Sequence, residues 1–177
     1  ITSFYGCSGQ RCLSGSILAP VGGVADELIA KFTAAAKAMK VGSGLDEKTA
    51  MGPVVSAAHK ERVLGYIEKG IAEGAKLVLD GRNFKVKEFP NGFFVGPTIF
   101  DNVTPDMTIA REEIFGPVLA AITVRDAEEA VRVGNSGVYG LAAAVWTRDV
   151  TRAHRIARAL RAGVVYVNCY DADDITV

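Results

Sequence analysis

The side chains best suited to covalent chemistry in this sequence are three cysteines, Cys7, Cys12 and Cys169. Cys12 follows two nearby glycines and stands directly after Arg11. Glycine lets the backbone turn tightly and approach a ligand, N–H groups beside a cysteine can bind a developing oxyanion, and a neighbouring guanidinium favours the thiolate. A small buried cysteine beside a surface arginine has the same spacing and is more common, so spacing alone favours that second interpretation.

A pair of acidic residues gives the second chemical signal. Residues 112–117 are Glu-Glu-Ile-Phe-Gly-Pro, directly ahead of the apolar residues 118–124. Ligands of α/β proteins gather at the ends of strands, so a carboxylate here could bind ribose hydroxyls and Phe115 could pack against a flat ring. An exposed turn with solvated acids fits these residues equally well. The sequence contains neither Gly-x-Gly-x-x-Gly nor the Walker pattern, which predicts that most of any nucleotide site lies outside these residues.

Other kinds of site have little support. Three cysteines are not a disulfide framework, and Cys7 and Cys12 lack a His or Cys partner at zinc spacing, so we expect no metal site. The formal net charge is zero, with 20 basic and 20 acidic residues, which argues against nucleic-acid and membrane-surface partners. No apolar run is long enough to span a bilayer. The few cysteines fit a reducing compartment, the cytoplasm or the mitochondrial matrix of a eukaryote.

Apolar periodicity predicts helices and strands that alternate along the 177 residues. Ser56, Asp126 and Asp149 are expected to cap helices that end near residues 70–74, 135 and 160, and another helix is expected over residues 24–41. The helix after Ser56 is expected to turn four residues inward: Val63, Tyr66, Ile67 and Ile71. The expected strands are residues 13–18, 76–79, 93–100 with a break at Gly96-Pro97, 118–124, 142–147 and 164–167. This order predicts an α/β domain with a mostly parallel sheet flanked by helices.

Short motifs in a fixed order cover nearly the whole chain. They are Gly-Gln-Arg-Cys at 9–12, Met-Gly-Pro at 51–53, Gly-Phe-Phe-Val-Gly-Pro-Thr at 92–98, residues 112–118, Asn135 with Tyr-Gly-Leu at 139–141, and Gly163 with Val-Asn at 167–168. With this set the sequence resembles the aldehyde dehydrogenase superfamily. The resemblance implies that residues 1–177 are the catalytic domain of that fold, a fragment lacking the N-terminal coenzyme-binding domain and the C-terminal oligomerisation segment. The start at Ile1, without an initiator Met, is also expected of a segment of a longer protein.

The resemblance implies a covalent mechanism and reverses the preference for a buried cysteine. Cys12 would attack a small-molecule aldehyde, hydride would pass to NAD or NADP, and water or coenzyme A would release the acyl group from the sulfur. Glu113 would hold the nicotinamide-side ribose and Phe115 would pack near the nicotinamide. His59 and Arg62 fall near positions that approach the adenosine side, although an exposed helix face is the preferred interpretation for both. The family habit also implies a homo-oligomer.

Two subfamily signals point to different aldehydes. The run at 9–12 and residues 79–97 are similar to methylmalonate-semialdehyde dehydrogenase, a coenzyme A-acylating enzyme, in which Arg11 would bind the substrate carboxylate. The tail at 167–174 is more similar to dehydrogenases of amino- or glutamylamino-aldehydes, in which Asp173 would attract a cationic amine; a solvated acidic loop is the alternative. The resemblance also puts the general base upstream of Ile1, so we expect the isolated 177 residues to be a folded fragment with little or no activity of its own.

Overall fold

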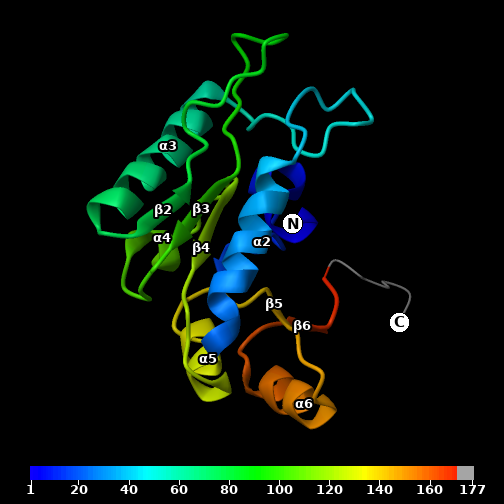
Figure 1. Ribbon diagram of the computed structural model, residues 1–177, viewed down its shortest axis with the longest axis vertical. Helices are drawn as coiled ribbons and strands as arrows, with labels where there is room; N and C mark the ends of the chain where they lie inside the picture. Colours follow the sequence, from blue (N-terminus) through cyan, green and yellow to red (C-terminus); the bar gives the residue numbers. More distant parts are fainter. Residues whose placement is uncertain (171–177) are drawn as a thin grey trace. The chain divides into compact units, whose positions relative to one another are not determined.

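The computed structural model describes residues 1–170 and divides the chain into two compact units, Ile1–Thr123 and Val124–Val177 (Figure 1). The first unit is built on a four-stranded sheet and the second on a two-stranded sheet, each with its own helices. All the residues of the two chemical signals, around Cys12 and around Glu113, belong to the first unit. The fold of that unit therefore decides how they meet.

The sheet of the first unit has the order β1-β4-β3-β2. Both β1 and β3 pair with β4 in parallel, whereas β2 pairs with β3 in an antiparallel direction. All four residues of β4 are buried, as expected for a central strand covered on both faces. The prediction of a mostly parallel sheet is confirmed. The strands are β1 (Ile17–Leu18), β2 (Lys76–Leu79), β3 (Thr98–Asp101) and β4 (Val118–Ala121).

Helices cover both faces of this sheet. On one face, α2 (Ala25–Lys37) buries apolar residues in a cluster that includes Ile99 of β3. On the other, α3 (Ala57–Ala72) lies so close that a methyl group added at Gly70 would meet the Phe100 ring at 3.0 Å. Successive residues of a strand point to opposite faces, so Ile99 and Phe100 place α2 and α3 on opposite sides of β3. Figure 1 shows the two helices flanking the strands in this way.

The helix that starts after Ser56 is present as predicted. The Ser56 hydroxyl accepts a hydrogen bond from the His59 amide at 3.1 Å, which satisfies one of the unpaired N–H groups of the first turn. Val63 and Ile67 are fully buried, but the predicted inward position of Ile71 is wrong, since it is 37% exposed. Tyr66 is only half-buried, and its hydroxyl points to an acidic side chain described below.

Several predicted strands are longer than the real ones. Of residues 93–100, only the last three lie in a strand, because Gly96 donates to the Gly81 carbonyl and Phe93 accepts from Val54, both in loops. Residues 13–16 and 122–124 also lie outside β1 and β4. The predicted helix over 24–41 ends at Lys37, and Val41 forms an isolated parallel bridge with Met51. Elements too short for a periodic signal were missed: α1 (Thr2–Tyr5), η1 (Gly6–Gly9), η2 (Gly22–Val24) and α4 (Thr108–Arg111).

The second unit forms one strand–helix–strand repeat preceded by a helix. Its strands, β5 (Ala142–Val145) and β6 (Val164–Val167), pair in parallel over four residues. Its helices, α5 (Ala127–Gly134) and α6 (Val150–Ala159), begin after Asp126 and Asp149, whose carboxylates accept from the amides of Glu129 and Arg152. Both predicted caps are confirmed.

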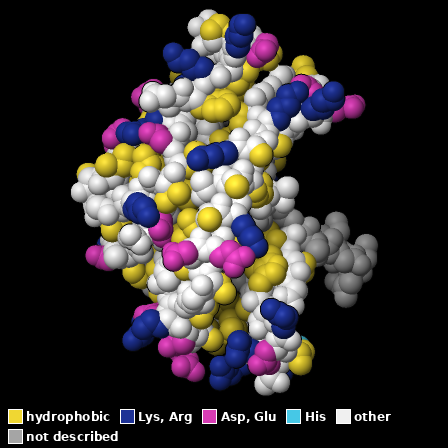
Figure 2. Space-filling model, viewed as in Figure 1, with side chains coloured by type: hydrophobic (Ala, Val, Ile, Leu, Met, Phe, Trp, Pro, Cys, Tyr) yellow, Lys and Arg dark blue, Asp and Glu magenta, His cyan; other side chains and the backbone are white. Residues whose placement is uncertain are grey.

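The surface mixes charges of both signs. Figure 2 shows Lys and Arg side chains interspersed with Asp and Glu over the visible face, without a single-sign patch. Among residues 1–170, no helix has both the length and the apolar character needed to cross a membrane.

Candidate active site

The loop before Cys12 makes an unusually tight turn. Cys7, Ser8 and Gly9 have φ values of 52°, 57° and 69°, so three successive residues adopt the left-handed conformation, which residues with a side chain rarely do. The Ser8 hydroxyl is buried and donates to the Gly52 carbonyl at 2.6 Å, while the Gln10 side chain accepts from the Val55 amide at 2.9 Å. The loop is thus tied to the segment around residues 51–55.

Cys12 lies at the surface, within a turn closed by a hydrogen bond of 3.0 Å from the Ser14 amide to the Arg11 carbonyl. Its side chain is exposed, so the interpretation as a buried core cysteine is wrong. Cys7 and Cys169 are exposed too, so exposure alone does not single out Cys12. The contacts of the loop separate Cys12 and Cys7, which share it, from Cys169, and the sequence motif favours Cys12 over Cys7.

A backbone contact joins this loop to the acidic turn about a hundred residues later. A methyl group added at Gly9 would lie 2.2 Å from the Gly116 carbonyl oxygen, far inside van der Waals distance. Only glycine, which tolerates φ 69° and has no Cβ, allows the two backbones to touch here. The sequence motifs at 9–12 and 112–117 therefore meet in space, as a joint site requires.

The acidic turn presents two of its side chains outward. Glu113 is exposed, and Phe115 is 37% exposed with φ 57°, a strained value for a residue with a side chain. Ile114 between them is buried and anchors the turn. The turn that bears this carboxylate and this aromatic ring touches the Cys12 loop through Gly116, and the predicted roles of Glu113 and Phe115 stay predictions.

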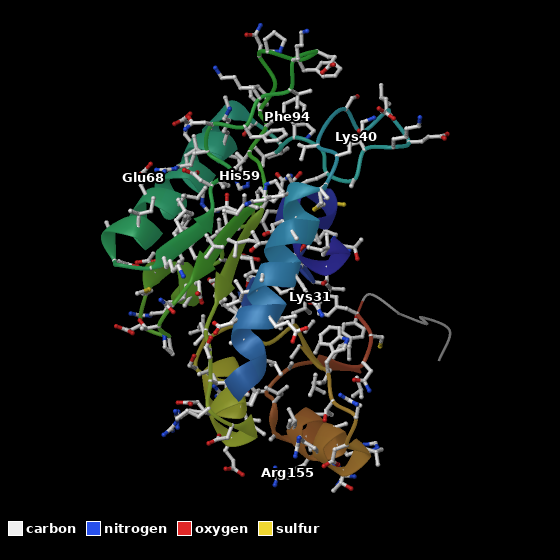
Figure 3. All side chains as sticks on the ribbon, viewed as in Figure 1. Lys31, Lys40, His59, Glu68, Phe94 and Arg155 are labelled. Atoms are coloured by element: carbon white, nitrogen blue, oxygen red, sulfur yellow. The ribbon has the colours of Figure 1, made fainter. Side chains whose placement is uncertain are left out.

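Two side chains of α3, Arg62 and His59, hold the backbone of this turn, and we call their contacts with its carbonyl groups the grip. The Arg62 guanidinium donates to the carbonyls of Ile114 at 2.6 Å and Glu113 at 2.8 Å. His59, labelled in Figure 3, lies in the first turn of α3 with Nε2 2.7 Å from the Phe115 carbonyl. Arg62 is exposed on α3, as the preferred interpretation from the sequence expects, and His59 is half-buried; both also bond the backbone of the turn, which the sequence did not predict.

A second contact from α3 engages the first of the two acids. The Tyr66 hydroxyl donates to a carboxylate oxygen of Glu112 at 2.7 Å, and this bond raises the pKa of Tyr66 above its usual range. The Arg62 guanidinium carbon lies 4.9 Å from the centre of the Tyr66 ring, within the range of a cation–π contact. Glu112 and Glu113 thus face different surroundings despite being neighbours.

Of the two residues predicted to bind substrate, Arg11 and Asp173, the structure describes only Arg11. The Arg11 guanidinium donates to the Thr2 carbonyl at 3.2 Å and lies against Gly6, so its charged end contacts residues that precede the loop. Its role toward a substrate carboxylate stays a prediction. Asp173 lies outside the described residues. Ser8 was missed by the sequence reasoning, and no local pattern marks it, because its partner Gly52 is distant in the chain.

Comparison with known proteins agrees with this geometry. The profile of the aldehyde dehydrogenase family matches residues 1–177, and the chain belongs to that family. It is 44% identical over 168 residues to malonate-semialdehyde dehydrogenase 2 of Geobacillus kaustophilus, covering 95% of this chain and 34% of that protein. It is 43% identical over 161 residues to betaine aldehyde dehydrogenase of Bacillus subtilis, covering 91% and 33%.

A solved structure shows the same fold. A protein of Sinorhizobium meliloti 1021, assigned as a methylmalonate-semialdehyde dehydrogenase and crystallised with NAD, matches with a TM-score of 0.93 and 42% identity, over 96% of this chain and 35% of that one. The chain spans about a third of the length of the curated relatives it matches. The α/β fold expected from the resemblance is confirmed.

Proposed function

We propose that the native protein containing this chain oxidises an aldehyde through a covalent intermediate on Cys12, with NAD as the hydride acceptor. The contact of Gly9 with Gly116 carries this proposal, because it sets the exposed cysteine loop against the turn that bears Glu113 and Phe115. The family membership and the NAD-bound relative support it.

The chemistry assigned to Cys12 needs an accessible thiol and a place for negative charge. The thiolate sulfur bonds to the aldehyde carbon, and the carbonyl oxygen takes the charge that the sulfur loses. The backbone N–H of Cys12 is the donor that we assign to this oxyanion. Loss of a hydride to the bound coenzyme would leave a thioester on Cys12. Water or the thiol of coenzyme A would then cleave it, so that the acyl group leaves as an acid or an acyl-CoA and the Cys12 sulfur takes the proton of the attacking group.

The described residues fit one end of a nicotinamide coenzyme. Glu113 supplies a carboxylate that can accept from ribose hydroxyls, and the exposed Phe115 ring can pack against a flat heterocycle. When bound, NAD supplies the two-electron acceptor that converts the thiohemiacetal into a thioester. The sequence holds no glycine-rich phosphate cradle, so we assign the rest of the coenzyme site to other parts of the native protein.

The substrate we favour is a small semialdehyde that carries a carboxylate, of the malonate or methylmalonate type. Arg11 adjoins the nucleophile, and a guanidinium matches the two oxygens of a carboxylate. The malonate-semialdehyde dehydrogenase among the relatives supports this choice. An aminoaldehyde or a related cationic aldehyde is the second candidate, favoured by the similar identity to a betaine aldehyde dehydrogenase. A homo-oligomer in the cytoplasm or the mitochondrial matrix completes the proposal.

A substrate panel tests the proposal. We expect the native protein to reduce NAD with malonate or methylmalonate semialdehyde, and coenzyme A to appear as acyl-CoA if it is the acceptor. The Arg11→Leu variant should raise KM for these two substrates by about tenfold or more and leave propanal almost unchanged. Arg11→Lys, which keeps the charge but not the planar fork, should fall between the two.

Two results would contradict the proposed substrate. One is efficient oxidation of betaine aldehyde or an aminoaldehyde with no turnover of either semialdehyde. The other is an equal rise in KM for propanal and for the semialdehydes in Arg11→Leu, which would show that Arg11 does not recognise the carboxylate.

A further inference from the structure

Three consecutive carbonyl groups of the acidic turn are bound by side chains of a single helix. The carbonyls of Glu113 and Ile114 accept from Arg62, and Nε2 of His59 lies at hydrogen-bond distance from the carbonyl of Phe115. Two of these carbonyls belong to Glu113 and Phe115, the residues whose side chains are proposed to meet the coenzyme, and the third belongs to Ile114 between them. The backbone that carries Glu113 and Phe115 is therefore held by groups other than its own local hydrogen bonds.

The helical register explains how one helix provides the whole grip. His59, Arg62, Val63 and Tyr66 are spaced at i, i+3, i+4 and i+7, so they lie along one face of α3. Val63 supports the turn from the same face, since a methyl group added at Gly116 would meet its Cγ2 at 2.6 Å. The contacts on residues 112–116 thus follow the face of α3 from its first turn to its third.

The grip opposes a local strain. Phe115 has φ 57°, a left-handed conformation that is strained for a residue with a Cβ and persists only where the surroundings enforce it. A guanidinium reaches two carbonyls at once with a rigid planar fork, and hydrogen bonds from a charged donor are stronger than neutral ones. A lysine at position 62 could reach only one of them with comparable geometry.

We propose that Arg62 and His59 are positioning residues, which act through the backbone of residues 113–115 to set Glu113 and Phe115 for the coenzyme. This inference rests on the proposed function, because it assigns the grip a role in NAD binding. It makes α3 part of the coenzyme site without requiring either side chain to touch NAD.

The experiment compares Arg62→Lys with the native protein, with Arg158→Lys as a control at an exposed arginine of α6. We expect Arg62→Lys to raise KM for NAD by about tenfold, with KM for the aldehyde changed less than about twofold. Hydrogen exchange followed by mass spectrometry should show amides 113–116 exchanging about tenfold faster, with the middle of α3 unchanged. His59→Gln, which keeps a donor, should be milder than His59→Phe in both measurements.

Distinct outcomes overturn the inference or its premise. Native-like exchange at amides 113–116 in Arg62→Lys would show that Arg62 does not hold the turn. Faster exchange with an unchanged KM for NAD would show that the grip is only structural. A native protein that neither binds NAD nor oxidises any aldehyde would remove the proposed function itself, and this is seen before any variant is made.

Discussion

The Cys12 loop and the acidic turn meet at one backbone contact, yet they are held by different means. The loop depends on small residues and close backbone approach, with Gly9 against Gly116 and the buried Ser8 hydroxyl on a carbonyl. The turn depends on long polar side chains that reach from α3 to its carbonyls and to Glu112. One region is limited by space and the other by hydrogen-bond geometry.

This difference indicates which changes each region tolerates. Where two backbones are already in van der Waals contact, there is no space for a further atom, so any added atom forces the two segments apart. Side-chain hydrogen bonds at a partly exposed surface exchange with water, so the loss of one costs much less. We therefore expect stability to depend strongly on the loop, and the placement of Glu113 and Phe115 to depend on α3.

The largest effect is expected for Gly9→Ala. The added methyl group would lie 2.2 Å from the Gly116 carbonyl oxygen, and alanine disfavours φ 69°. Steric displacement and backbone strain together should lower the free energy of unfolding by about 3 kcal/mol, measured by urea denaturation. Gly23→Ala is the matched control, because a methyl group there has no atom within 4 Å. Equal stability of the two variants would show that the contact between loop and turn is loose.

A small effect is expected for Tyr66→Phe, on the turn side of the comparison. The variant keeps the ring beneath Arg62 and loses both the hydrogen bond to Glu112 and the long one, of 3.4 Å, that the hydroxyl accepts from Arg62. Together these should cost about 0.5 kcal/mol at this partly exposed site. The folded-state pKa of Tyr66 is raised by this bond, so its stabilisation is fully present below the unfolded pKa of about 10 and is lost as pH rises through the folded value.

Denaturation at several pH values checks this sign. The difference between native protein and Tyr66→Phe should be constant from neutral pH to about 9 and should shrink above about 10. A double-mutant cycle with Glu112→Ala separates the pair from other losses. A coupling energy of zero, or a difference that grows at high pH, would show that the bond does not stabilise the turn.

The features predictable from sequence are those set by local chemistry. Ser56, Asp126 and Asp149 were identified as caps because a short polar side chain ahead of an amphipathic run acts within its own turn. The sequence indicates the break at Gly96-Pro97, but residues 93–95 lie in a loop and not in a strand, because the partner of Phe93 is Val54, far away in sequence. A run of apolar residues therefore indicates that the segment is buried more reliably than it indicates that the segment pairs with a neighbouring strand.

The site divides in the same way. Cys12, Glu113 and Phe115 can be named as candidates because they stand in recognisable motifs, and their roles stay predictions. The grip by Arg62 and His59 was missed, because it depends on which face of α3 packs against a turn about fifty residues later in the chain. Ser8 was missed for the same reason, since its bond to Gly52 exists only once the loop is folded.

Trapping of the acyl group on the protein tests the central claim most directly. The native protein would be mixed with NAD and malonate semialdehyde without coenzyme A, quenched in acid, digested and mapped by mass spectrometry. The account predicts an acyl mass increment on the peptide bearing Cys12, its decrease when coenzyme A is added, and its absence from Cys12→Ser. An increment on Cys7 or Cys169 instead, or undiminished aldehyde oxidation by Cys12→Ser, would contradict the account.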